Sequence, residues 1–205
     1  MKLLSRVSQD AAVSAWLRAE IDSSRFAASI SSSLARHGIP RSMITDPDLE
    51  SSLQNACRLN ILAGYRGFGR PAIDGAEWLA GRNVGELDWW RVELSRSELA
   101  GVRFTDGGFW TEESEGTRLP GVHVRRLLAD KERPEDDLPN LVHAAVLAGI
   151  ELPPMIVIDA GPGTRLVVLE GHVRLIAYVM AGSAAPDRVI AILGRSPSVA
   201  TWPEY

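Results

Sequence analysis

Cysteine is nearly missing from this sequence, since Cys57 is the only one among 205 residues. A single thiol excludes an intrachain disulfide and any metal centre built on several cysteines. No apolar run reaches the ~20 residues that a membrane-spanning helix needs. The first ten residues, MKLLSRVSQD, also lack the apolar centre of a secretory signal. We therefore expect a cytoplasmic protein that makes no use of a membrane.

A strong excess of charge of one sign is also lacking, because the formal net charge is only -4. The sequence therefore gives no general reason to expect attraction to DNA or to anionic lipid. No Gly-x-Ser-x-Gly elbow, Walker loop or His-Glu-x-x-His motif occurs, so the commonest signatures of hydrolases, phosphate-binding loops and zinc proteases are excluded. An apolar share of 45% and a charged share of 23% are typical of a soluble globular chain.

Residues 1–70 are predicted to form a helical segment. Apolar residues recur at helical spacing from Ser8 to His37, with Ser8 as a cap, and Asp46-Pro47 has the form of a second helix start. Residues 71–87 are expected to be a linker or an irregular cover. The arginines of this region (Arg66, Arg70 and Arg82) contact nucleic acid or phosphate, or they are simply solvated, and the second interpretation is favoured.

Residues 88–194 predict an α+β domain, or one of the α/β class, and 195–205 a loop-like tail. Aromatic and β-branched residues indicate strands, and Ser95 followed by Glu98 has capping-box form. We expect strands at 89–94, 155–159, 165–169 and 188–193, helices at 137–148 and 172–181, and a loop at 104–117. In the 137–148 helix, Leu141, Ala144, Ala145 and Ala148 form an apolar face.

The strand-to-helix turn Glu170-Gly171-His172-Val173-Arg174 carries the main functional hypothesis. Glycine permits a sharp turn, and the first N–H groups of the following helix attract anions. Arg174 is the only charged residue between His172 and Ala181, and it opposes the helix dipole by about 0.3–1 kcal/mol. The side chain therefore reaches water or meets an anion. That anion is a bound phosphate, or it is the carboxylate of Glu170, Glu151 or Asp159 in a structural ion pair.

The same turn resembles the signature turn of the ParB/sulfiredoxin-like nucleotide-binding superfamily. The resemblance covers about 88–194 and is strongest over 138–182, where a helix ending at Gly149, the strand ELPPMIVID and the turn follow in the family's order. Members include CTP-hydrolysing DNA-partition proteins, an ATP-dependent sulfinic-acid reductase and free-serine kinases. The reductase chemistry needs a thiol in the turn, and this turn has none.

The resemblance implies a nucleoside triphosphate or diphosphate with Mg²⁺, held by Gly171, His172, Val173 and Arg174. If there is turnover, it implies an ATP- or CTP-dependent phosphotransferase or nucleotide hydrolase, in which Glu170 or Glu98 would orient the attacking group. His172 and Val173 depart from the family, whose kinases and reductase place histidine directly before the arginine. The alternative function is a non-catalytic protein-interaction module, with a partner or a second copy held by the 1–70 helices.

Other candidate residues have simpler explanations. Glu112, Glu113 and Glu115 could bind a cation, but glutamates in a loop are usually solvated. His123 and His143 lack metal-ligand spacing, and no metal site is predicted. Trp110 and its aromatic neighbours could stack a base, although such residues more often fill a core.

Overall fold

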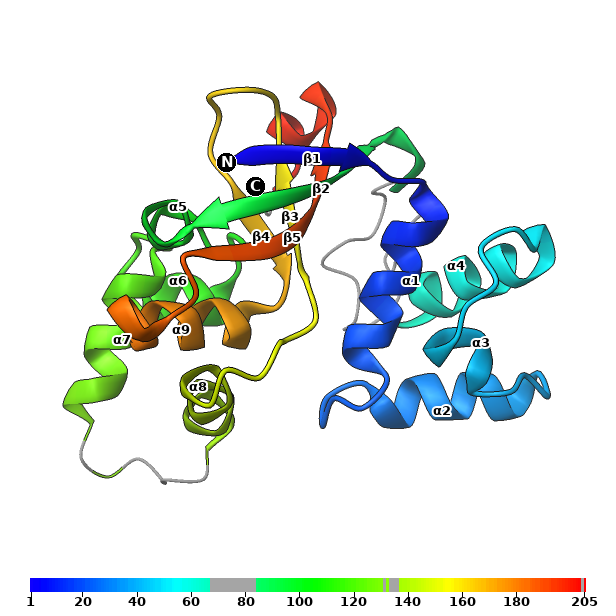
Figure 1. Cartoon of the computed structure of the whole chain (residues 1–205), viewed down its shortest axis with the longest axis horizontal. Helices are drawn as coiled ribbons and strands as arrows, with labels where there is room; N and C mark the ends of the chain where they lie inside the picture. The colour runs from blue at the N-terminus through cyan, green and yellow to red at the C-terminus, as the bar shows by residue number, and fades with distance from the viewer. Residues whose placement is uncertain (67–83, 131, 133–136, 204) are drawn as a thin grey trace. The chain divides into compact units, whose positions relative to one another are not determined.

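The computed structural model describes residues 1–66, 84–130, 132, 137–203 and 205. The chain forms two compact units, which are described separately below. Unit 1 comprises Met1–Arg6 and Trp90–Tyr205, and unit 2 comprises Val7–Trp89. In chain order, unit 2 is therefore inserted after the first strand of unit 1 (Figure 1). Most of the linker expected at 71–87, together with Arg70 and Arg82, lies outside the described residues.

A five-stranded mixed sheet forms the centre of unit 1, in the order β1-β2-β5-β3-β4. The strands are β1 (Lys2–Arg6), β2 (Asp88–Ser95), β3 (Met155–Asp159), β4 (Val167–Glu170) and β5 (Arg188–Arg195). β3 pairs parallel with β5, aligning Met155 with Ala191, and antiparallel with β4, aligning Ile156 with Glu170. β1 pairs antiparallel with β2 and lies at one edge. This mixed sheet with its helices confirms the predicted α+β class.

The helices of unit 1 pack around α9, which lies against the sheet. They are α5 (Arg96–Gly101), α6 (Gly108–Glu113), α7 (Pro120–Ala129), α8 (Leu138–Leu147) and α9 (His172–Ala181), with the 3-10 turns η2 (Gly182–Ala184) and η3 (Pro197–Thr201). Figure 1 shows α5 to α9 gathered on one side of the strands. Leu175 and Ile176 of α9 are fully buried with Val157 and Leu193 of the sheet. This apolar layer fixes the position at which α9 begins.

Unit 2 is helical in its described part. It contains α1 (Gln9–Glu20), α2 (Ala27–Arg36), α3 (Ser42–Thr45), α4 (Ser52–Arg66) and the 3-10 turn η1 (Val84–Glu86). Two of its buried arginines are bonded within the unit: Arg58 donates to the carbonyl oxygens of Met43 and Asp48, and Arg66 pairs with Glu20. Because Arg66 is buried and lies 4.0 Å from the centre of the Phe26 ring, it is a core residue, neither solvated as expected nor exposed to a nucleic acid.

Several expected elements are confirmed. α9 spans the predicted 172–181 and β3 the predicted 155–159, while β2, β5 and α8 agree to within one or two residues. The capping box at Ser95 is present, with the Ser95 hydroxyl accepting from the Glu98 N–H and the Glu98 carboxylate accepting from the Ser95 N–H. Ser8 caps α1 by accepting from the Ala11 N–H. The turn at Gly161 closes the β3–β4 hairpin.

The prediction of one helix from Ser8 to His37 is wrong, because α1 ends at Glu20 and α2 begins at Ala27. Ser23 makes the break: its hydroxyl and its carbonyl oxygen both accept from the Phe26 N–H, at 3.0 and 3.2 Å. Serine side chains compete in this way with helical hydrogen bonds. The helix start at Asp46-Pro47 is also wrong, since Asp46 ends α3 and α4 begins at Ser52.

Residues Lys2–Arg6 are a strand and not part of a helical segment. All five are exposed, so this edge strand has no alternating apolar pattern from which it could be predicted. The loop expected at 104–117 contains α6, and the tail contains η3. Within the residues that the structure describes, no helix is both long and apolar enough to cross a membrane.

Candidate functional site

The turn between β4 and α9 depends on a glycine. Gly171 has φ of 100°, in the left-handed region that side chains rarely adopt. A Cβ added here would lie 2.8 Å from Met155 Cγ and 3.0 Å from Arg174 Nη2. Two features therefore require glycine at position 171: the left-handed backbone conformation, and the close packing of Met155 of β3 and of Arg174 against it. The Leu175 N–H donates to the Gly171 carbonyl oxygen and closes the first turn of α9.

Arg174 is buried and folds back over Gly171. Its Nη1 donates to the carbonyl oxygens of Pro153 and Pro154 at 2.7 and 3.1 Å, and its Nη2 donates to Glu170 Oε1 at 3.0 Å. Burial lowers the pKa of the Arg174 guanidinium, while the nearby Glu170 carboxylate acts to raise it. Of the two interpretations of this arginine, the structural ion pair is the one observed, and Glu170 is the partner.

The two other carboxylates considered for Arg174 have different roles. Asp159 is buried and accepts from Arg195 at 2.6 and 2.5 Å, an arrangement that raises the pKa of Arg195. Glu151 is exposed and acts to raise the pKa of Tyr178, although burial is the larger cause of that increase. Glu170 is thus paired with Arg174, and Asp159 is paired with Arg195.

His172, the first residue of α9, lies in an aromatic cluster. Its ring stacks on Trp110 with centroids 4.7 Å apart and planes 11° apart, and lies near Phe104 at 5.9 Å. His172 Nε2 is 3.2 Å from the Thr105 hydroxyl. His123 meets the edges of both Phe104 and Trp110 and lies 3.6 Å from a Glu113 carboxylate oxygen. The His172 ring is therefore held in one orientation beside the helix start.

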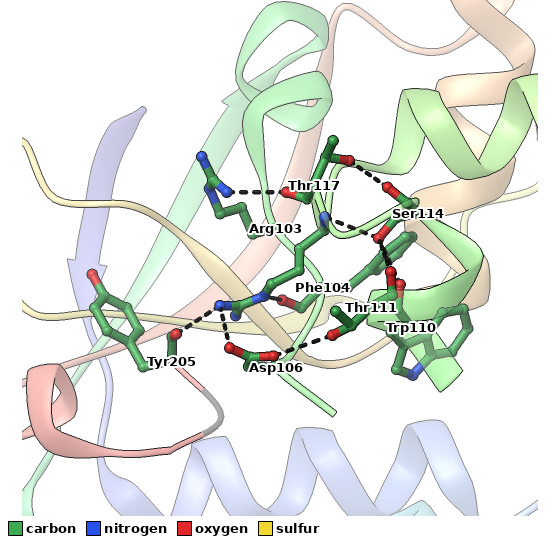
Figure 2. Close-up of polar contacts among 9 residues, drawn as sticks. Arg103, Phe104, Asp106, Trp110, Thr111, Ser114, Thr117 and Tyr205 are labelled. Carbon is green, nitrogen blue, oxygen red and sulfur yellow. Dashed lines mark hydrogen bonds and ion pairs between the residues drawn. The ribbon is translucent and has the colours of Figure 1, made fainter. Parts of the chain in front are cut away.

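A buried arginine anchors the loop that carries Phe104 and Thr105 (Figure 2). Arg118 Nε donates to the Phe104 carbonyl oxygen at 2.8 Å, and its Nη1 donates to the Tyr205 carbonyl oxygen at 2.8 Å and lies 3.5 Å from Asp106. Burial lowers the Arg118 pKa, the Asp106 carboxylate acts to raise it, and Arg165 and Arg103 act to lower it. Arg118 therefore holds the loop through one of the loop's carbonyl oxygens and through the loop's own carboxylate.

The Ser114 hydroxyl connects this loop to α6. It donates to the Trp110 carbonyl oxygen at 2.6 Å and accepts from the Arg118 N–H at 2.9 Å. Arg118 has φ of 61°, a strained conformation that such contacts must stabilise. Figure 2 also shows the Thr111 hydroxyl donating to the Asp106 carboxylate, which joins α6 to the 103–106 segment. The position of Trp110, and with it the stack on His172, follows from this network.

Both predicted catalytic carboxylates already have partners within the protein. Glu98 is engaged in the α5 capping box and pairs with the Met1 amino group, whereas Glu170 is paired with Arg174. Val173 is half-buried on α9. Glu113 of the acidic cluster pairs with Arg126 as well as His123. Among the described residues, no group of three acidic, histidine or cysteine side chains is close enough to hold a metal ion.

Sequence reasoning missed Thr105, Phe104 and Arg118 as neighbours of the turn. They lie more than fifty residues from His172 along the chain, and no local pattern links them. The aromatic residues next to Trp110 in the sequence are the one signal that points to a stacking surface, and they do not indicate that His172 is part of it. No protein-family model, curated protein or solved structure matches this chain. The resemblance to the ParB/sulfiredoxin-like superfamily therefore stays a prediction.

Proposed function

We propose that the first turn of α9 binds the phosphate groups of a nucleotide. The observation that carries the proposal is the form of this helix start. α9 has ten residues, begins at a left-handed glycine, and has no side-chain hydrogen bond from its capping residue. The first N–H groups of a helix lack intrahelical partners and carry the positive end of the dipole. Such a helix start is suited to an anion.

The surroundings of the turn support the same ligand. His172 is oriented by its stack on Trp110 and by Thr105, so a ring nitrogen and a hydroxyl lie beside the helix start. In this proposal Arg174 positions the turn and does not itself contact the phosphate. Mg²⁺ would arrive bound to the nucleotide phosphates.

The proposal covers binding and extends to phosphoryl transfer or nucleotide hydrolysis only if a base is found. Glu170 is paired with Arg174, and Glu98 caps α5. Orienting an attacking hydroxyl or water requires a carboxylate or another acceptor within reach of the phosphate. Release of Glu170 from Arg174 would supply one, at the cost of leaving a buried cation without its partner.

The test is a thermal-shift screen of ATP, ADP, CTP and GTP, each with Mg²⁺. A ligand at 100 times its Kd adds about 2.7 kcal/mol to the free energy of unfolding, which raises Tm by about 6–10 °C for a domain of this size. Val173→Glu places a carboxylate in the first turn, where it favours the helix dipole but repels phosphate. We expect this variant to fold and to lose the shift.

Leu147→Glu is the matched control, because it adds the same charge at an exposed site on α8. We expect it to retain the nucleotide shift. If no nucleotide at millimolar concentration raises Tm, or if Val173→Glu responds as the parent chain does, the proposal is wrong.

The second candidate is a non-catalytic interaction module that resembles the superfamily only in its fold. The observation that favours it is that the Arg174 guanidinium already donates to three acceptors of the chain itself. In this case the turn is a structural device, and the α1–α4 helices bind a protein partner. Absence of any nucleotide shift would favour this function.

A further inference from the structure

α8 and the turn that follows it expose an apolar surface. Its large exposed residues are Leu138, Leu141, Leu147 and Ile150, which are between 51% and 59% exposed. Ala144 and Ala148 are also exposed and lie between them. We call these six residues the α8 face. No charged residue occurs from Leu138 to Ile150.

The α8 face is not the side by which α8 joins unit 1. Val146 is buried in the core, and Val142 packs against the same core. The apolar residues predicted to face inward, Leu141, Ala144 and Ala148, are instead exposed. α8 is therefore apolar on both sides, and helices of that kind are usually covered on both sides. Leu141, Ala144 and Ala148 follow the i, i+3, i+7 spacing of one helix side, and exposed apolar surface of this kind commonly marks an interaction site.

The charges at the two ends of the α8 face indicate what kind of partner covers it. Asp137 caps the helix at one end and Glu151 follows at the other. The chain has no lysine or arginine from Leu138 to Thr164. A second copy would bring acidic ends together in either orientation, with Asp137 facing Asp137 in a parallel pair and Glu151 in an antiparallel pair. An anionic membrane would be repelled for the same reason.

We infer that the α8 face binds an amphipathic helix of a partner protein whose apolar stripe is flanked by lysine or arginine. Leucine and isoleucine side chains supply the apolar contact, and the acidic ends select basic flanks and set the position of the partner helix along α8. This inference is independent of nucleotide binding, because the α8 face includes no residue of the α9 turn.

The probes are two synthetic helical peptides with the same leucine stripe at i, i+3, i+4 and i+7, one with lysine flanks and one with glutamate flanks. Fluorescence anisotropy with the full chain should give a Kd about tenfold lower for the lysine peptide. Leu141→Glu should weaken its binding by about tenfold or more. Leu53→Glu, at a leucine that is 75% exposed on α4, should leave the Kd unchanged.

Circular dichroism of each variant shows whether it is folded, and Leu141→Gln repeats the test without a new charge. Equal affinity for the two peptides, or affinity that Leu141→Glu and Leu141→Gln do not change, would overturn the inference. It would also be overturned if the chain sediments as a dimer that Leu141→Glu dissociates. Flotation with phosphatidylserine vesicles that depends on Leu141 would instead assign the α8 face to a membrane surface and overturn the partner helix.

Discussion

At the start of α9, the Arg174 guanidinium lies where a cation opposes the helix dipole. The fold compensates with two proline carbonyl oxygens and one carboxylate, all on neighbouring segments. Charge-assisted hydrogen bonds are worth roughly 1.5–3 kcal/mol each, so three of them outweigh the unfavourable dipole. The arginine thereby ties the Pro153-Pro154 segment to the turn and keeps Gly171 covered. In the proposed site, its effect on the nucleotide is indirect, through the shape of the helix start.

This residue-scale account predicts that Arg174→Ala is strongly destabilising. Removing one partner of a buried pair costs about 3–5 kcal/mol, which urea denaturation would record as a lower midpoint. Arg174→Lys should lose less but still more than about 1 kcal/mol, because an ammonium cannot reproduce the planar fork. Glu170→Gln, which keeps a hydrogen-bond acceptor, is the milder control. An Arg174→Ala variant within about 0.5 kcal/mol of the parent would show that these contacts are not structural.

The sequence indicated that Arg174 meets an anion, but it did not select Glu170 over a bound phosphate. Both interpretations place a negative charge near the same guanidinium, and the two proline carbonyl oxygens that complete its shell come from twenty residues earlier. The direction of the Arg174 side chain decides which of the two anions it meets. A pattern of residue types carries no information about that direction.

At the scale of elements, α6 is a short helix positioned mainly by polar contacts. It has six residues, none of them fully buried, yet it carries the Trp110 ring that stacks on His172. The Ser114 hydroxyl joins it to Arg118 and so to the 103–106 segment. The expected loop at 104–117 missed this helix because Gly107-Gly108 and the glutamates are typical of loops. Tertiary contacts override that local preference.

Ser114→Ala should therefore loosen α6. The substitution removes an acceptor from the buried Arg118 N–H, at a cost of about 1–2 kcal/mol in the free energy of unfolding, and near-UV circular dichroism should report weaker packing of Trp110. Ser31→Ala, at an exposed serine within α2, is the control and should be close to neutral. If the two variants behave alike in urea, the Ser114 contacts do not hold α6 in place.

Element prediction succeeded for α9 and β3, where an apolar run is bounded by glycine or proline. It failed in orientation for α8, because LPNLVHAAVLAGI is apolar around the whole helix and gives no preferred buried face. The structure turns Val146 inward and Leu141 outward. That choice depends on the shape of the surface that α9 offers, which a single sequence does not reveal.

At the scale of the whole molecule, unit 2 is an insertion between two paired strands. β1 and β2 align Arg6 with Trp90, and the Val7 N–H donates to the Trp89 carbonyl oxygen at 3.0 Å. The insertion therefore begins and ends at adjacent points of one antiparallel ladder. Insertions of this kind are tolerated because they leave the host fold continuous. This insertion could not be predicted from the sequence, because β1 is short and exposed and the helices of unit 2 follow it directly.

Replacing residues 8–88 by Asn-Gly should thus leave unit 1 able to fold, because a two-residue type I′ turn matches the twist of a β1–β2 hairpin. The expected result is a cooperative thermal transition and a far-UV spectrum with both helix and strand. A version joined by a longer Gly-Ser linker controls for turn geometry. If neither version unfolds cooperatively, unit 1 needs unit 2 in order to fold, and the two units are not independently stable.

The proposed phosphate site is tested most directly by NMR titration of the ¹⁵N-labelled chain with ATP and Mg²⁺. The account predicts that the backbone amide signals of His172, Val173 and Arg174 move together and saturate with one Kd, and that Val173→Glu abolishes these changes. Amide signals at the start of α9 that stay fixed while ATP reaches millimolar concentration would contradict it.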